Sequence, residues 1–428
     1  MKQLLKSPVA GFLALLARFV LMKYRPIVVM VTGSVGKTST KDAVAAALSP
    51  KFNLRASEKS YNSEFGVPLT IIGAKNPWND PLAWIKVIGE AFALIFLPNH
   101  YPRLLVLEVG ADRPGDLKKI LAIATPDAVV VTRLPEVPVH VEAYASPAAV
   151  REEEFAPAYA LAPHTPLIIS ADDSFAKHLA SRLDARITTY GFAKDADIRI
   201  EGEMLRTEDP GPLGMHAQVV VGENHYDLSA QGALGRQQLY APAAALACAL
   251  SLGLSTKEAL KGLEDYLPPP GRSRLLAGVS NAILIDDTYN SSPAAVEEAL
   301  RAISLIKAKR RIVVLGDMLE LGRYSTHEHE RIGTLAAHAA DIVVGVGARA
   351  ISITEAARKK GKSEKEALHY ASAQDAVDGL RDVLHPGDVV LIKGSQGVRM
   401  ERIVKELLKD ANDSRLLVRQ DPEWLKKA

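Results

Sequence analysis

A glycine-containing turn between a strand-like run and a helix-like run constrains this chain most. The β-branched run at 27–32 leads into Thr-Gly-Ser-Val-Gly-Lys-Thr at 32–38, and an alanine-rich helical pattern follows at once. Glycines let the backbone curl so that amide groups surround a phosphate, and the helix N-terminus adds its dipole. Lys37 supplies a cation and Thr38 a magnesium ligand. The sequence therefore predicts a phosphate-binding loop, although Val31 stands where the usual motif has glycine.

The rest of the first half alternates strand-like and helical segments. Apolar runs at 104–109, 128–132 and 167–170 are separated by helical patterns, which predicts a mostly parallel α/β sheet covered on both faces. Shorter alternation between 198 and 229 suggests an antiparallel patch added to that sheet. Glu108 ends the apolar run at 104–108, so we expect it at the carboxyl edge of the sheet, where such folds bind ligands.

A proline-rich stretch marks a domain boundary. Ser255 to Glu258 has the form of a helix capping box, and the helix that it begins is followed by Leu-Pro-Pro-Pro-Gly at 267–271. A second strand–helix alternation then begins, in which Pro293 suits a first helical turn. It lacks Gly-x-Gly-x-x-Gly, so dinucleotide binding is not supported. We predict an apolar helix at 1–26, a central ATP-binding domain at 27–267 and a Rossmann-like α/β domain at 268–428.

The composition excludes several classes of protein. Hydrophobic residues make up 48% and charged residues 24% of the 428 positions, the balance of a folded globular protein. The formal net charge of +2 gives no overall field to attract nucleic acid, so we expect no such partner. The single cysteine, Cys248, can form neither an internal disulfide nor a cysteine zinc site. We expect it in the core of a protein of the reducing cytoplasm.

Two apolar stretches leave a choice open. Residues 9–22 are too few to span a bilayer and include Arg18, whereas 81–97 include Lys86 and Glu90. One interpretation is that both stretches are helices packed on the protein. The other is peripheral membrane contact through 1–26 and 81–97, aided by basic side chains of the first stretch: Lys2, Lys6, Lys23 and Arg25.

Seven segments in a fixed order resemble one enzyme family. They are TGSVGKTSTKD (32–42), YNSEFGVPLT (61–70), LEVGADRPGD (107–116), GRSRLL (271–276), IDDTYNSSP (285–293), VLGDMLELG (314–322) and IKGSQGVRME (392–401). Together they resemble the Mur ligases, which phosphorylate a carboxylate with ATP and let an amine attack the acyl phosphate. The resemblance implies ATP and Mg²⁺ as cofactors, and the joining of D-alanyl-D-alanine to a muramyl tripeptide in peptidoglycan synthesis. We also expect a monomer acting on small-molecule or precursor-peptide substrates.

The resemblance also implies roles for individual residues. It assigns the catalytic set Lys37, Glu108, His140 and Arg272, with Arg272 reaching the γ-phosphate. It assigns ATP phosphate binding to Gly33, Ser34, Val35, Gly36, Lys37, Thr38 and Ser39. It assigns magnesium to Thr38, Glu108 and His140, and ribose and adenine to Asp286, Asp287, Tyr289 and Asn290. Which of the two aspartates faces the nucleotide stays open. Lys393, Gly394 and Ser395 would help seat the incoming amine.

Three departures from the family pattern affect these assignments. Glu154 stands where the family has a carbamylated lysine, so its carboxylate could support the metal directly, or 152–154 could be a solvated helix face. Gln238 is the amide left to pair with adenine in 235–241, where the family has asparagines. Residues 1–26 are too few for the family's uridine-binding domain, which we expect to be absent. A lipid-linked or other non-nucleotide acceptor, or a nucleotide-gated scaffold without ligase activity, therefore remain alternatives.

Overall fold

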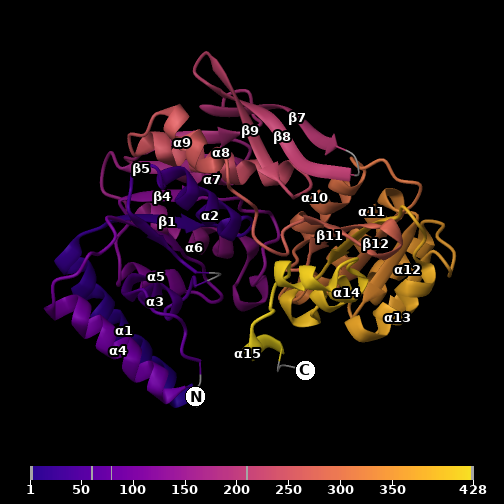
Figure 1. Cartoon of the computed structure of the whole chain (residues 1–428), viewed down its shortest axis with the longest axis horizontal. Coiled ribbons are helices and arrows are strands. Elements are labelled where there is room, and N and C mark those ends of the chain that lie inside the picture. Colours follow the sequence, from indigo (N-terminus) through magenta and orange to yellow (C-terminus); the bar gives the residue numbers. More distant parts are fainter. Residues whose placement is uncertain (1–2, 59–60, 79, 209–210, 426–428) are drawn as a thin grey trace.

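Two α/β units build the molecule. The computed structural model describes residues 3–58, 61–78, 80–208 and 211–425. Within these ranges the strands form one sheet of nine and one of six. Figure 1 shows the first unit in indigo to magenta and the second, on the right, in orange to yellow. The mixed α/β fold class with a mostly parallel first sheet and a second C-terminal sheet is confirmed, and the predicted boundary at 267/268, which falls between the sheets, stays a prediction.

The first sheet is parallel except at one edge. Its order is β2-β3-β1-β4-β5-β6-β7-β8-β9, and antiparallel pairing begins only with β7 and β8. Val31 lies opposite Glu108 in the register of β1 and β3, so the phosphate loop and Glu108 leave the sheet at the same edge. The strands are β1 (Ile27–Thr32), β2 (Leu54–Ala56), β3 (Leu104–Glu108), β4 (Ala128–Val131), β5 (Pro166–Ser170), β6 (Arg186–Gly191), β7 (Ile198–Glu208), β8 (Gly211–Val221) and β9 (Asn224–Gln231).

Helices cover both faces of this sheet because successive strand residues point to opposite sides. In β1, Val29 and Val31 pack with α2 (Lys37–Leu48), α8 (Tyr240–Ser251) and α9 (Thr256–Leu263). Val28 and Met30 pack on the other side. The helices there are α1 (Gln3–Tyr24), α3 (Gly66–Ile72), α4 (Pro81–Phe96), α5 (Asp116–Leu121), α6 (Pro147–Tyr159) and α7 (Ser174–Ala180).

Several helical features predicted from the sequence are present in these helices. Ser255 and Glu258 form the predicted capping box at the start of α9. Cys248 is fully buried in α8, and burial raises the pKa of its thiol to about 12. Both apolar stretches are helical, as α1 and α4, and these helices pack on each other and on α3. No helix in the described part of the chain is long and apolar enough to cross a bilayer. Lys2 and the Lys6 side chain lie outside the described residues.

The second unit has the predicted strand–helix alternation. Its sheet order is β10-β11-β15-β12-β13-β14, parallel except for β10. Its strands are β10 (Arg274–Ala277), β11 (Ile283–Asp287), β12 (Arg311–Gly316), β13 (Ile342–Val346), β14 (Ala367–Tyr370) and β15 (Val389–Lys393). α10 (Pro293–Ile303), α11 (Ser325–Ala339) and α12 (Ile351–Lys359) cover one face, and α13 (Ala373–Val383) and α14 (Glu401–Leu407) the other. A short helix, α15 (Pro422–Leu425), follows. Pro293 occupies the first turn of α10, as predicted.

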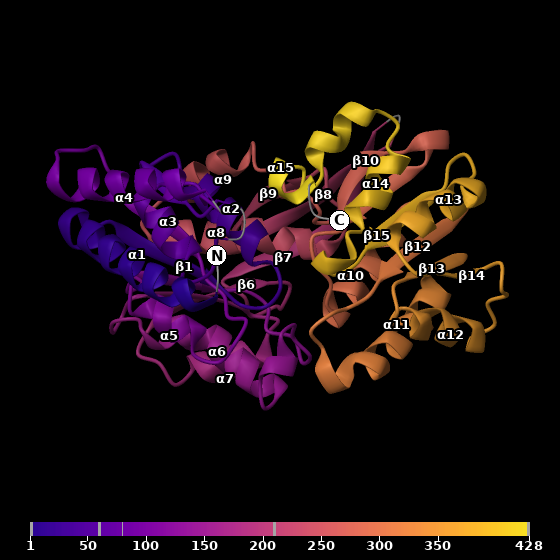
Figure 2. The same ribbon diagram turned by 90° about the horizontal axis from the view of Figure 1, so that it is seen from below.

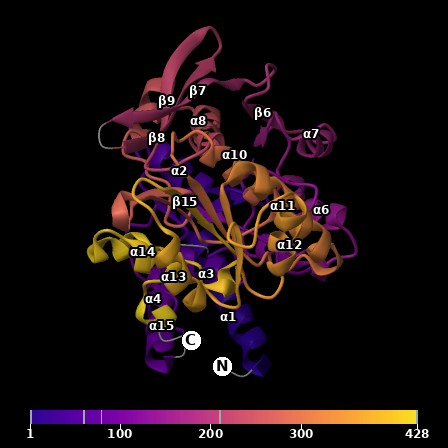
Figure 3. The same cartoon turned by 90° about the vertical axis from the view of Figure 1, so that its right-hand side faces the viewer.

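A cleft separates the two units. Figure 2 shows them side by side, and Figure 3 shows α1 and α4 at the far end of the first unit from β7 to β9. The cavity between the units measures about 2090 Å³ and is lined by residues from both. Glu108 and Asp287, which end β3 and β11, both line it, so the carboxyl edge of each sheet faces the same space.

Candidate active site

The predicted phosphate loop joins β1 to α2. Gly33 and Gly36 have φ angles of 115° and 92°, which disfavour any side chain. A Cβ on Gly33 would also lie 2.3 Å from the hydroxyl oxygen of Thr132. Val31 replaces the motif's first glycine without conflict, because it is still within β1 and fully buried. The backbone N–H groups of Ser34 and Val35 donate to the carbonyl of Arg133, at 3.1 and 3.2 Å, so the loop is fixed against the segment that follows β4.

Lys37 and Glu154 form the inner part of this loop. The ammonium of Lys37 donates to the carbonyl of Gly33 and lies 3.6 Å from Glu154 Oε1. Glu154, on α6, accepts from the backbone N–H of Gly33 at 2.9 Å. Burial raises the pKa of Glu154, against the opposing effects of Lys37 and His140. Glu154 is therefore no part of a solvated face: it sits behind the loop and does not line the cavity.

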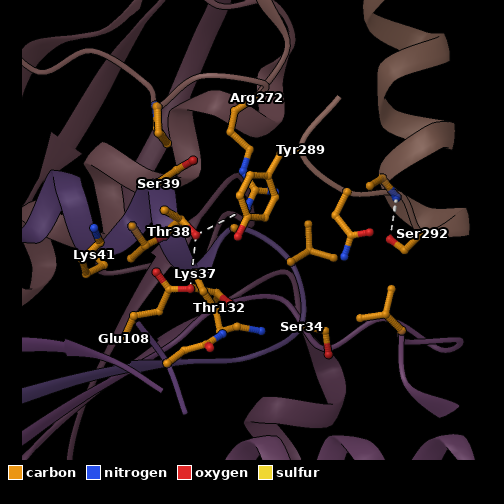
Figure 4. Close-up of a pocket in the computed structure, with 18 of the residues that line it drawn as sticks. Ser34, Lys37, Thr38, Ser39, Lys41, Glu108, Thr132, Arg272, Tyr289 and Ser292 are labelled. Carbon is orange, nitrogen blue, oxygen red and sulfur yellow. Dashed lines mark hydrogen bonds between the residues drawn. The ribbon is translucent and has the colours of Figure 1, made fainter. Parts of the chain in front are cut away.

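Thr38 links Glu108 to the second unit. Its hydroxyl donates to Glu108 Oε1 at 3.2 Å and accepts from Arg272 at 3.4 Å, as the dashed lines in Figure 4 show. The second carboxylate oxygen of Glu108 is buried and has no hydrogen-bond partner among the described residues. Burial raises the pKa of Glu108, while the charges of Lys41, Lys37 and Arg272 oppose the rise. Glu108 is thus a buried acid, and one of its oxygens is available to a ligand.

Arg272 comes from the connector between the units. Its guanidinium lies 4.0 Å from the ring centroid of Tyr289, a cation–π contact that directs it across the cleft toward Thr38. Gly271 has φ 69°, and a Cβ there would lie 2.9 Å from the backbone nitrogen of Tyr289. The glycine therefore allows the connector to pass close to Tyr289, which brings Arg272 to the phosphate loop.

The two adjacent aspartates at the end of β11 have different surroundings. Asp287 lines the cavity, accepts from Ser273 N at 3.2 Å and pairs with Lys393 Nζ at 2.8 Å. Asp286 points away from the cavity, and its Oδ1 accepts from the hydroxyl of Thr288. Burial raises the pKa of Asp286 to about 6. Of the two, only Asp287 lines the cavity, and both of its oxygens already have partners within the protein. Lys393 also donates to the carbonyl of Asn290, at 2.9 Å.

His140 meets the second unit rather than Glu108. Its Nδ1 lies 2.9 Å from Glu320 and its Nε2 lies 3.5 Å from Asp112. Burial opposes protonation of the imidazole, but its hydrogen bond to Glu320 and the two nearby carboxylates outweigh burial and raise its pKa. The ion pair with Glu320 therefore joins the two units across the cleft.

Only some of the predicted magnesium ligands are placed so that they fit the ion. In the ranges that the structure covers, no group of three or more His, Cys, Asp or Glu side chains is arranged to hold a metal. Thr38 and Glu108 do fit Mg²⁺, since both present oxygen and one buried Glu108 oxygen is unpartnered. His140 is directed to Asp112 and Glu320, and Glu154 to Gly33 and Lys37.

Most of the remaining predicted residues line the same cavity. The lining includes Ser34, Val35, Gly36, Lys37, Thr38, Ser39, Glu108, His140, Gln238, Arg272, Asp287, Tyr289, Asn290, Lys393 and Ser395. Gly33, Asp286 and Gly394 do not line it. Their roles in binding and catalysis stay predictions.

Sequence reasoning missed three cavity-lining side chains. Lys41 is buried one helical turn after Lys37, and its charge opposes the rise in the pKa of Glu108. Its spacing of four residues from Lys37 could have predicted that both lie on the same side of the helix. Arg419 donates to the carbonyls of Thr288, at 3.1 Å, and Tyr289. Trp424, on α15, lies beside Arg419. No local motif predicts Arg419 or Trp424, because their contacts depend on how the C-terminal segment packs against the second unit.

Solved structures share this architecture, and curated relatives match the sequence. The MurF ligase from Thermotoga maritima, solved in complex with ADP, is 25% identical, with a TM-score of 0.77 over 94% of this chain and 84% of that chain. A MurF structure from Acinetobacter baumannii, 22% identical, has a TM-score of 0.77 over 94% of this chain and 81% of that one. The UDP-N-acetylmuramoyl-tripeptide–D-alanyl-D-alanine ligase of Bacillus subtilis is 27% identical over 395 residues, 92% of this chain and 78% of the relative.

Two domain families match the chain in order. The Mur ligase middle domain matches residues 31–249, and the glutamate ligase domain of the Mur ligases matches residues 271–396. The first match contains the phosphate loop, Glu108, His140 and Glu154, whereas the second begins at the Gly271 connector. The middle domain alone spans more than half of the sequence, and so the chain belongs to the Mur ligase family.

Proposed function

We propose that this ligase joins D-alanyl-D-alanine to the carboxylate of a muramyl tripeptide precursor. ATP-dependent ligation with Mg²⁺ is the chemistry of its family, and the B. subtilis relative is named for this pair of substrates. The proposal includes a monomeric chain in the cytoplasm, with peripheral membrane contact through 1–26 and 81–97.

One observation supports the proposal most. The phosphate loop and Glu108 of the first unit meet the connector's Arg272 at a single atom, the Thr38 hydroxyl. Phosphoryl transfer from ATP to a carboxylate in the cleft needs cations around the transferred group, because negative charge develops on its oxygens. Lys37 and Arg272 place one cation on each side of the cleft. The large cavity leaves space for a nucleotide and for both joined substrates.

The residues suggest how the steps are divided. Lys37 is held by Gly33 O and Glu154, and it must turn from them toward the β- and γ-phosphates. Arg272 then stabilises the γ-phosphoryl group as it moves to the substrate carboxylate, leaving ADP and an acyl phosphate. The amine attacks that carbonyl, phosphate leaves, and the nitrogen loses a proton. Bound Mg²⁺, held by Thr38 and Glu108, would offset phosphate charge.

Closure of the cleft protects the reactive acyl phosphate. The His140–Glu320 pair and the Arg272–Thr38 bond already join the two units. Exclusion of water by these contacts favours attack by the amine over hydrolysis.

A lipid-linked acceptor is the second candidate. The exposed apolar side chains of α1 and α4 favour it, because they give the enzyme a way to approach a substrate anchored in a membrane. The two candidates differ in which precursor is consumed, so a comparison of UDP-linked and lipid-linked tripeptides separates them.

Substitution of Lys37 tests the proposal. The purified full chain is incubated with ATP, Mg²⁺, D-alanyl-D-alanine and each tripeptide precursor, and ADP release and product mass are measured. Lys37→Ala should lower turnover at least about 100-fold, because one main cation on the phosphates is lost. Lys118→Ala, an exposed lysine of α5 away from the cleft, is the matched control. Wild-type turnover by a folded Lys37→Ala protein, or no product from any acceptor, would contradict the proposal.

A further inference from the structure

Exposed apolar side chains are concentrated on two helices. In the described part of the chain, ten of the eighteen large exposed apolar side chains lie between residues 12 and 97. They are Phe12, Leu15, Phe19, Met22, Trp78, Leu82, Ile85, Phe92, Phe96 and Leu97. We call the exposed sides of α1 and α4, with these residues, the α1–α4 face. Large contiguous apolar patches on a protein surface mark places where another surface binds.

Each of the two helices has two apolar sides, and only one of them is buried in the core. On α1, Leu13, Leu16, Ala17 and Val20 are buried, whereas the exposed residues recur every three or four positions from Phe12 to Met22. On α4, Val87, Ala91 and Leu94 are buried, and Leu82, Ile85, Phe92 and Phe96 are exposed. Core packing therefore accounts for one side of each helix, and within the described ranges the core does not cover the other side.

The two helices form a fixed pair. Lys23 donates to the carbonyls of Leu94 and Leu97 at 2.8 and 2.7 Å, and the Tyr24 hydroxyl donates to Leu94 O at 2.8 Å. Tyr24 also stacks on Tyr101, with ring centroids 4.5 Å apart. Figures 1 and 2 both show the pair on the side of the molecule that is opposite the second unit. A surface on that side can be covered without closing the cleft.

The charges beside this face are mainly positive. Among the side chains that the structure describes from Pro8 to Arg25, three are basic, Arg18, Lys23 and Arg25, and none is acidic. On α4, Lys86 lies 3.9 Å from Glu90, so these two largely cancel. A second copy docked α1 to α1 would place like charges together, whereas an anionic surface would be attracted by them.

We infer that the α1–α4 face docks on the surface of an anionic lipid bilayer, with its Phe, Leu and Ile side chains in the headgroup region. Aromatic and aliphatic side chains flanked by Arg and Lys are typical of helices that lie in a membrane interface. Neither helix can cross a bilayer, so the contact is peripheral. This inference gives a lipid class and a protein face to the membrane contact in the proposed function, and it does not depend on the ligase reaction.

Vesicle flotation tests the inference with the full chain. The probes are vesicles of phosphatidylcholine alone and of phosphatidylcholine with phosphatidylglycerol. The wild-type protein should float with the anionic vesicles and less so at high salt. Phe19→Gln/Ile85→Gln should weaken binding at least about tenfold, and Arg18→Gln about fivefold. Matched controls are Ile351→Gln/Leu305→Gln, which are 44% and 48% exposed on the other unit, and Lys359→Gln.

Several outcomes would overturn the inference. A folded wild-type protein that floats with neither vesicle excludes it, as does equal binding by the face variants and their controls. Concentration-dependent dimerisation that Phe19→Gln/Ile85→Gln abolishes, without vesicle binding, would identify the face as an interface between copies. Ligation of soluble substrates is measured on the same samples. A protein that ligates but does not float contradicts only the membrane docking, and one that floats but ligates nothing contradicts only the proposed function.

Discussion

Glu108 and Asp287 occupy the same place in the two units and have opposite surroundings. Each is a buried carboxylate that ends the second strand from an edge of its sheet and lines the cleft. Asp287 uses both oxygens, one for the backbone of Ser273 and one for Lys393. Glu108 uses one oxygen for Thr38 and leaves the other unpartnered among the described residues.

The difference separates a structural acid from a ligand-binding one. Burying a carboxylate costs free energy unless hydrogen bonds or opposite charges satisfy it. Asp287 is satisfied within the protein and fixes the start of β10 against the end of β15. Glu108 is not satisfied in this way. Burial raises its pKa by keeping it from water. A bound cation would therefore supply the partner that water cannot. The following changes test this division, from the largest expected effect to the smallest.

Asp287→Ala should destabilise the second unit most. It leaves Lys393, which is almost fully buried, without its carboxylate, and breaking a buried ion pair in this way costs about 3–5 kcal/mol. Denaturant unfolding followed by circular dichroism measures the change. Asp378→Ala, at an exposed position of α13, is the control and should change little. Equal stability of the two variants would show that Asp287 is not structural.

Asp286→Asn should instead stabilise the protein at neutral pH. A carboxyl whose pKa is about 6 in the folded state and 3.8 otherwise is protonated more readily when folded. Its contribution to stability is complete below pH 3.8 and is lost as pH rises through about 6, with Asp287 and Glu401 adding to the effect. Asparagine cannot ionise, so its advantage should grow across this range to on the order of 3 kcal/mol. Urea unfolding of both proteins from pH 4 to 8 measures it, and a pH-independent difference would refute the assignment.

Glu108→Gln should affect metal use more than folding. The amide keeps the shape and can still accept from Thr38, but it removes the charge that suits Mg²⁺. We expect at least about a tenfold rise in the Mg²⁺ concentration for half-maximal ADP release, with thermal stability unchanged or higher. An equally large loss of folding stability would place Glu108 with Asp287 and end the contrast.

Glu154→Gln distinguishes two roles for the acid behind the phosphate loop. If Glu154 supports the metal in place of the family's carbamylated lysine, loss of its charge should raise the Mg²⁺ requirement, and removal of dissolved CO₂ should not affect the wild type. Its contacts with Gly33 and Lys37 predict a further, smaller change in the KM for ATP, because they shape the loop. Glu152→Gln, at an exposed position of the same helix, is the neighbouring control. An unchanged Mg²⁺ requirement in Glu154→Gln would leave it a positioning residue only.

Local patterns were sufficient for much of the fold and for the first half of the site. The glycine turn predicts the phosphate loop because glycine's conformational freedom is a local property. The apolar run before Glu108 places that residue at a sheet edge. Short β10 and β14 had no such signal, since each has only four residues and mixed polarity and forms by pairing with a longer neighbour.

Contacts between distant segments could not be predicted in the same way. Strand alternation shows that Asp286 and Asp287 point to opposite faces, but not which face lines the cleft. His140 meets Glu320, and Arg419 meets Tyr289, only after both units are folded and placed together. Such contacts depend on tertiary packing, which no short segment encodes.

The positions of the two ends of the described chain limit where a purification tag can be attached. Trp424, in α15, lines the cleft, so a tag joined soon after Leu425 would begin beside the cleft. A tag before Gln3 would begin beside the α1–α4 face. The tight turn at Gly222 and Glu223, where Val221 pairs with Asn224 at the tip of the β8–β9 hairpin, is exposed and outside the cavity lining. An affinity peptide or fluorescent label inserted there would leave both the cleft and the docking face free for measurement.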